Sequence, residues 1–98
     1  MHDIPELPEP GQLFRHVDGG VYRFVTTARH AEDGTQMMVY HHVWPFEPDT
    51  WVRAANEWQS RFTPMSQSEL VEVLAGDRTD AQAALTQAKA TRRAAQSR

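Results

Sequence analysis

Histidine is the residue type in this sequence that offers the widest choice of chemistry. Four of the five histidines, His16, His30, His41 and His42, lie within or beside segments that resemble strands. Zinc requires three or four ligands that converge on one point, whereas adjacent residues on a strand point to opposite faces. His41 and His42 are therefore poorly placed to share one ion, and no His-x-His or Glu-His helical pair is present. We expect neither a metal site nor a cofactor.

His30 is the best candidate for a general base, because Glu32 and Asp33 follow it. A neighbouring carboxylate orients an imidazole and fixes its tautomer. A histidine beside an acid in a turn more often stabilises that turn by a hydrogen bond. The chain has no nucleophile-elbow motif and no glycine-rich phosphate loop. We expect no catalytic residue, and a small hydrolase-like or metal-assisted enzyme that uses His16 and His30 is the alternative.

Aromatic side chains near an arginine point instead to ligand binding. Trp51 and Arg53 are two residues apart, so on a strand they face the same way and could stack on a planar group and pair with an acidic one. An internal salt bridge is the competing role for Arg53. Tyr22 and Tyr40 add polar tips to the aromatic set. The candidate ligand-binding residues are His16, Tyr22, His30, Tyr40, Trp51 and Arg53.

Short strands with tight turns must position these side chains. Asp18-Gly19-Gly20 and Asp33-Gly34 are typical of hairpin turns, and alternation in 21–30 places Tyr22, Phe24, Thr26, Ala28 and His30 on one face. The expected elements are an extended, proline-rich lead-in at 1–10, strands at 11–17, 21–30, 36–44 and 51–53, a helical turn at 54–58, and a strand at 61–63. Five short strands predict a small closed barrel, because closure removes exposed edges.

The remaining residues predict a helical extension. Ser66 and Glu69 form a capping box, Met65 and Leu70 are spaced for a hydrophobic staple, and a helix should cover about 67–75.

A second helix should begin near a capping box at 79–82. Leu85 is its one large apolar residue, so we expect it to pack weakly or on a partner, such as a second copy of the chain, and to fray from about Arg92.

Composition and charge restrict the function classes. Residues 1–76 carry five arginines and eleven acids, a balance of −6, whereas residues 77–98 carry five cations and two acids, a balance of +3. A body this acidic is a poor binder of phosphate backbones, so we do not expect a nucleic-acid partner. A module that binds nucleic acid through its basic C-terminal helix is a further alternative. The absence of cysteine excludes disulfides and thiolate sites, and the chain has neither a membrane-length apolar run nor a signal peptide. We expect a cytoplasmic protein.

Several motifs in residues 11 to about 63 occur in the order and spacing of a known family. They are Phe14-Arg15-His16-Val17-Asp18-Gly19, Tyr22, Ala28-Arg29-His30-Ala31-Glu32-Asp33, Val39-Tyr40 and Trp51-Val52-Arg53. On these motifs the chain resembles the bacterial family catalogued as domain of unknown function 1653. It departs from the family after Trp-Val-Arg, where Ala54 and Glu57-Trp58 replace a proline and a Met-Phe pair. The resemblance implies a Src-homology-3-like barrel and no established activity.

Together these observations predict a mainly β chain. A five-stranded Src-homology-3-like barrel should span residues 11–64, with the lead-in before it and the helical extension, 65–98, after it. The predicted function is non-catalytic binding of a small molecule or a protein whose identity the sequence does not specify.

Overall fold

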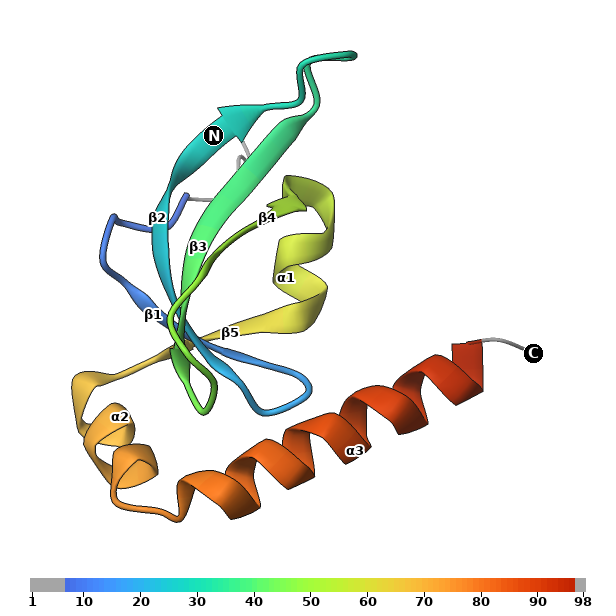
Figure 1. Ribbon diagram of the computed structural model, residues 1–98. Coiled ribbons are helices and arrows are strands. Elements are labelled where there is room, and N and C mark those ends of the chain that lie inside the picture. Colours follow the sequence, from blue (N-terminus) through green and yellow to red (C-terminus); the bar gives the residue numbers. More distant parts are fainter. Residues whose placement is uncertain (1–6, 97–98) are drawn as a thin grey trace.

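A five-stranded antiparallel sheet and four helical elements make up the computed structural model, which describes residues 7–96 (Figure 1). The strands are β1 (Leu13–His16), β2 (Val21–Arg29), β3 (Gln36–Trp44), β4 (Thr50–Ala54) and β5 (Phe62–Met65). The helical elements are η1 (Ala55–Glu57), α1 (Trp58–Arg61), α2 (Gln67–Leu74) and α3 (Arg78–Gln96). Residues 1–6 of the predicted lead-in and residues 97–98 of the predicted helical extension lie outside the described residues.

The predicted order of strands and helical turns is confirmed, with boundaries that differ by a few residues. Gly19 and Gly34 adopt positive φ angles of 106° and 74° in the turns after β1 and β2, a backbone region that favours glycine. The Thr35 N–H also donates a hydrogen bond to the Asp33 carboxylate at 2.9 Å. Local turn chemistry therefore accounts for the β1–β2–β3 meander.

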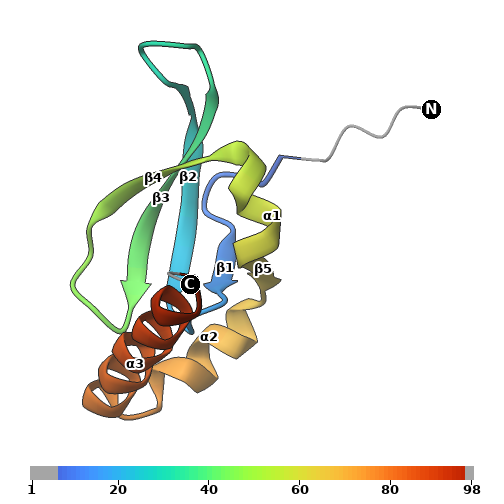
Figure 2. The same ribbon diagram turned by 90° about the vertical axis from the view of Figure 1, so that its right-hand side faces the viewer.

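The sheet is open, so the predicted closed barrel is not supported. The strand order is β4-β3-β2-β1-β5, and β4 and β5 are the two edges. The chain between these edges forms η1 and α1 instead of extending either strand, and β5 is only four residues long and contains Pro64. In Figures 1 and 2 this helical segment lies against one face of the curved sheet. β4 and β5 therefore do not pair with each other, and the short helical segment η1–α1 covers the sheet between them.

The face of the sheet covered by α1, which we call the inner face, carries the larger core. Its buried cluster consists of Phe14, Phe24, Met38, Tyr40, Trp58 and Phe62. Trp58, at the start of α1, stacks on Phe62 with ring centroids 3.9 Å apart and an interplanar angle of 12°. It also meets Phe14 edge-on at 5.1 Å. α1 is only four residues long, so this aromatic packing anchors it to the sheet.

A bulge in β2 interrupts the predicted alternation of faces. Phe24 is opposite Tyr40, but Thr26, two residues later, is opposite Val39, the next residue of β3. The extra residue reverses which side chains face inward from that point. Tyr22 and Phe24 therefore lie on the inner face as predicted, whereas the predicted placement of Thr26 and Ala28 on the same face is wrong.

The other face of the sheet packs against α2. Leu13, Val21, Met65 and Leu70 form a second buried cluster, and Val73 packs against it. The predicted capping box is confirmed: the Glu69 N–H donates to Ser66 Oγ at 3.1 Å, and the Ser66 N–H donates to Glu69 Oε1 at 3.0 Å. Burial of Met65 and Leu70 in one cluster also agrees with the predicted staple.

α3 lies along one end of the sheet (Figures 1 and 2). Its first turn is capped by Asp77, whose carboxylate accepts a hydrogen bond from the Asp80 N–H at 2.8 Å, so the predicted capping box at 79–82 is wrong. The helix begins at Arg78, so Asp77 and not Thr79 is its N-cap residue, and Asp77 accepts the hydrogen bond from the unpaired N–H of the first turn. A Cβ at Gly20 would lie 3.0 Å from Leu85 Cδ1, so glycine at this position permits the close approach of α3 to the turn after β1.

α3 remains helical through Gln96 instead of fraying from Arg92. Arg92 forms an ion pair with Asp18, with Nη2 and Oδ2 2.9 Å apart. This contact fixes the last turns of α3 to the β1–β2 turn. No helix in the described part of the chain has both the length and the apolar character needed to cross a bilayer.

Candidate functional site

Five of the six predicted site residues share the inner face of the sheet. Residues directly opposite each other in paired strands lie on the same face. The relevant pairs are His16 with Phe62, Phe14 with Tyr22, Phe24 with Tyr40, Tyr40 with Trp51 and Met38 with Arg53. The register therefore places His16, Tyr22, Tyr40, Trp51 and Arg53 on one surface.

His30 is not part of this surface. It follows the last residue of β2, in the turn at the far end of the long β2–β3 hairpin. Its Nδ1 accepts a hydrogen bond from the Glu32 N–H at 3.2 Å and lies 3.7 Å from Asp33 Oδ1. His16 precedes the opposite end of β2, and nine strand residues span about 30 Å. The structure therefore does not bring His16 and His30 together.

His16 is buried, with 8% of its surface exposed. Its Nδ1 accepts a hydrogen bond from the Asp18 N–H at 3.0 Å, and its ring meets Phe62 edge-on at 4.9 Å. Burial, which disfavours the imidazolium, lowers the pKa of His16 to about 4, and the charges of Arg53 and Arg92 act in the same direction. The buried Nε2 atom has no hydrogen-bond partner in the structure. His16 is therefore a neutral core histidine with one unused polar atom.

Tyr22 and Tyr40 belong to a packed aromatic cluster. Their ring centroids are 5.2 Å apart, and the Tyr22 ring lies 4.5 Å from the ring of His42. Burial raises the pKa of Tyr22 to about 12 and lowers the pKa of His42, whose Nε2 lies 2.8 Å from the Trp44 carbonyl oxygen. Tyr40 is fully part of the core. Tyr40, a candidate ligand-binding residue from the sequence, is therefore a core residue.

Trp51 and Arg53 lie on the edge strand and differ in their surroundings. Half of the Trp51 surface, 50%, is exposed. Arg53 is half-buried, and its Nη1 donates to Glu57 Oε1 at 3.0 Å. Arg53 Nε is buried and has no hydrogen-bond partner. The Trp51 ring is therefore partly exposed next to Arg53, whose guanidinium already forms an ion pair with Glu57.

Asp18, His42 and Arg92 were not predicted as site residues, although they lie beside this surface. The Asp18 side chain is buried, and its hydrogen bonds to Arg92 lower the pKa of its carboxyl group. In the sequence Asp18 is indistinguishable from an ordinary turn residue, and Arg92 from a solvated helical cation. One feature of the sequence suggested a contact between Asp18 and Arg92: residues 1–76 carry a net charge of −6, and residues 77–98, which we call the basic tail, carry +3.

The basic tail is partly neutralised by contacts within the protein. Besides the Asp18–Arg92 pair, Arg78 donates through Nε to the Pro45 carbonyl at 2.7 Å and lies 3.5 Å from Glu47 Oε1. Within residues 7–96, no three His, Asp or Glu side chains gather closely enough to hold a metal ion. His41 is exposed and His42 is buried, as expected for adjacent strand residues.

A groove of about 890 Å³ lies on the inner face between the chain before β1, the start of β3 next to the β2–β3 turn, and the helical segment η1–α1. Buried Phe14, Met38, Trp58 and Phe62 contribute to it from below. The other lining residues are Leu7, Pro8, Gln12, Thr35, Gln36, Ala55, Asn56, Gln59 and Pro64. None of the thirteen carries an ionisable side chain. The sequence did not reveal this groove, because its walls come from five separate segments.

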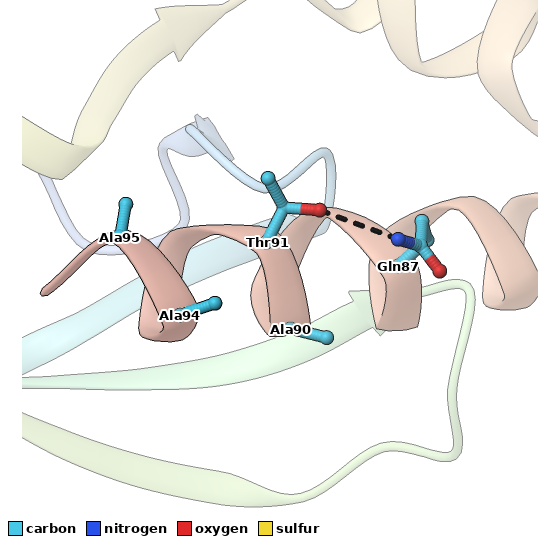
Figure 3. Close-up of a pocket in the computed structure, with 5 residues that line it drawn as sticks. All are labelled: Gln87, Ala90, Thr91, Ala94 and Ala95. Atoms are coloured by element: carbon cyan, nitrogen blue, oxygen red, sulfur yellow. Dashed lines mark hydrogen bonds between the residues drawn. The ribbon is translucent and has the colours of Figure 1, made fainter. Parts of the chain in front are cut away.

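A shallower hollow of about 640 Å³ lies on α3 (Figure 3). Figure 3 shows its lining residues, Gln87, Ala90, Thr91, Ala94 and Ala95, along one side of the helix. Gln87 donates a hydrogen bond to Thr91 at 3.3 Å, so the two polar side chains bind each other. The lining of this hollow therefore presents mainly alanine methyl groups and little that would select a ligand.

Comparison with known proteins agrees with the motifs in the strands. The model of the family described as "Protein of unknown function (DUF1653)" matches residues 12–68. No curated protein and no solved structure matches the chain. The matched segment covers β1 through the first residues of α2 and includes the whole inner face. Because this match spans more than half of the 98 residues, the chain belongs to the DUF1653 family.

Proposed function

We propose that the protein is a non-catalytic binding module, and that it binds its ligand at the β4 edge of the inner face. The observation that supports this proposal most directly is the exposure of half of Trp51 beside Arg53. Tryptophan carries the largest apolar surface of any side chain, and a folded domain normally buries it. A half-exposed ring on an otherwise aromatic face is therefore available for stacking.

The chemistry of the pair favours a ligand with a planar group and an anionic group. The Trp51 ring would stack on the planar group, and the Arg53 guanidinium would pair with the anion. Glu57 now occupies one side of Arg53 at 3.0 Å, so the ligand anion must compete with the Glu57 carboxylate. The unpaired Arg53 Nε supports the same ligand class, because a buried donor gains stability when it finds an acceptor.

Fluorescence and NMR titration with nucleoside monophosphates, acidic peptides and neutral sugars will test the proposal. We expect the anionic planar compounds to bind and to shift the Trp51 indole resonance. Trp51→Ala should abolish the binding, and Arg53→Gln should weaken it about tenfold, as expected for the loss of one charge-assisted contact. Glu57→Gln removes the competing carboxylate and should tighten the binding.

Val52→Ala is the matched control, because Val52 is an exposed neighbour that points to the opposite face of β4. It should leave the affinity unchanged. Binding that persists in Trp51→Ala, or that Glu57→Gln weakens, would refute the proposed role of this surface. A neutral sugar that binds as tightly as the nucleotides would refute the anionic ligand class.

We also propose that the sheet is related to Src-homology-3-like folds, although its edges do not pair. The pairing of β1 with β5 and the helical turn between β4 and β5 support this relation. In such a fold the loops and the edge strand carry the binding residues, and the central strands hold them rigidly. This arrangement is consistent with Trp51 on β4 as the binding residue and Tyr40 on β3 as its support.

A further inference from the structure

We propose that the groove lined by Phe14, Met38, Trp58 and Phe62 is a second binding site, for an uncharged small molecule with a planar apolar body. The groove adjoins the Trp51–Arg53 surface, because Met38 is opposite Arg53, but neither Trp51 nor Arg53 lines it. Its volume of about 890 Å³ falls within the range of small-molecule sites. The proposal therefore does not depend on the proposed function.

The charge of the lining selects against ions. Asp, Glu, Lys and Arg make up 23% of the chain, yet the groove has thirteen lining residues without one ionisable side chain. A charged ligand would lose part of its hydration there without gaining an ion pair. A neutral ligand has no such loss and gains the contact with the aromatic floor. Charge complementarity therefore points to a neutral ligand.

The polar groups around the groove specify the rest of the ligand. Four primary amides, those of Gln12, Gln36, Asn56 and Gln59, line it together with Thr35. Each amide both donates and accepts hydrogen bonds, so the set is suited to carbonyl and N–H groups at the edge of a ring. The floor is rigid, because Trp58 is stacked on Phe62 and held edge-on by Phe14. A planar body with carbonyl or amide substituents matches both features.

Titration of the full-length chain with Nile red tests this site, because the dye is planar, uncharged and carries a carbonyl oxygen. We expect one saturable site per chain and shifts of the Met38 methyl and Trp58 indole resonances. The anionic dye 8-anilinonaphthalene-1-sulfonate, which has a comparable apolar area, should bind at least about tenfold more weakly at this site.

Amide-to-carboxylate variants place a charge at the groove with almost no change of shape. Gln36→Glu and Asn56→Asp should each weaken Nile red binding about tenfold. Gln87→Glu is the matched control, since it makes the same change on α3, at the hollow of Figure 3. It should have no effect, and neither should Trp51→Ala, so the two proposed sites fail or succeed separately.

Four results would overturn the inference. The first is that Nile red does not bind. The second is that Gln36→Glu and Asn56→Asp both leave Nile red binding unchanged, while the dye shifts resonances at Trp51 or on α3. Binding that requires removal of residues 1–6 would show that the chain's own N-terminal segment is the occupant. Groove resonances that shift with protein concentration alone would assign the groove to a second copy of the chain.

Discussion

The Asp18 carboxylate and the Arg92 guanidinium form a bidentate ion pair between residues 74 positions apart in the sequence. Arg92 Nη2 lies 2.9 Å from Asp18 Oδ2, and Arg92 Nε lies 3.1 Å from Oδ1. The Asp18 side chain is only 7% exposed, and its Oδ2 also lies 3.6 Å from His16 Nδ1. The pair therefore connects the C-terminal turns of α3 to the β1–β2 turn, next to His16 on the inner face.

Loss of this ion pair should loosen α3. Because the Asp18 side chain is buried and the geometry is bidentate, we expect Arg92→Gln to lower the free energy of unfolding by about 1 kcal/mol in 0.1 M salt, and by less in 0.5 M salt. Urea denaturation of a double-mutant cycle with Asp18→Asn measures the coupling. The exposed neighbour Arg93→Gln serves as control. A coupling energy of zero would show that α3 is held by its other contacts.

Stability should fall on mild acidification because of His16. Burial lowers its pKa from 6.5 to about 4, so between these values the unfolded chain takes up a proton that the folded chain does not. The free energy of unfolding therefore decreases as the pH falls through this window, by on the order of 3 kcal/mol in total. Denaturant titrations between pH 4 and pH 7 measure this slope.

His16→Asn isolates the contribution of this histidine, since the Asn oxygen can replace Nδ1 as acceptor for the Asp18 N–H. The variant should reduce the slope by up to about 1.4 kcal/mol per pH unit in that window. Val73→Ala, which trims the other core cluster and has no titratable group, should lower stability equally at every pH. A wild-type slope in His16→Asn would mean that His42 and the carboxylates carry the effect.

The cap of α2 should have a measurable effect on stability. Ser66→Ala removes the acceptor of the Glu69 N–H and should lower the free energy of unfolding by about 1 kcal/mol. Ser68→Ala, in the first turn of the same helix, makes the same chemical change away from the cap and should not destabilise the protein. Equal urea midpoints for Ser66→Ala and the wild type would contradict the importance of the capping box.

Substitution of Trp58 and of Trp51 should affect the stability of the protein to very different extents. Trp58 is buried and stacked on Phe62, so Trp58→Ala should lower the free energy of unfolding by about 3–5 kcal/mol. Trp51→Ala, at a half-exposed edge position, should cost less than about 1 kcal/mol. Thermal and urea denaturation of both variants provide the comparison. A large loss from Trp51→Ala would make Trp51 a structural residue and weaken its proposed role as a binding residue.

Features governed by neighbouring residues were predictable from the sequence. The turns at Gly19 and Gly34 and the capping box of Ser66 with Glu69 depend on interactions across four or fewer positions. Alternation also placed Trp51 and Arg53 on the same face of their strand, whereas the face shared by five site residues depends on the register between strands. These local rules were sufficient for the meander and for the Trp51–Arg53 pair.

Features governed by distant contacts were not predictable. The bulge between Phe24 and Thr26 leaves no clear trace in the residue types, and it reversed the expected faces of the outer half of β2. The chain between β4 and β5 is helical and packs on the sheet through Trp58, and the ordered end of α3 contacts Asp18. Each of these outcomes rests on side chains brought together only by the complete fold.

The second core cluster has a consequence for how this unit could be excised or transplanted. The family match ends at residue 68, but Leu70 and Val73, which seal the sheet on the face opposite α1, lie after that point. A graft that stops at the family boundary would leave Leu13, Val21 and Met65 open to water and prone to self-association. The shortest segment that keeps both core clusters covered therefore extends through Leu74, the end of α2.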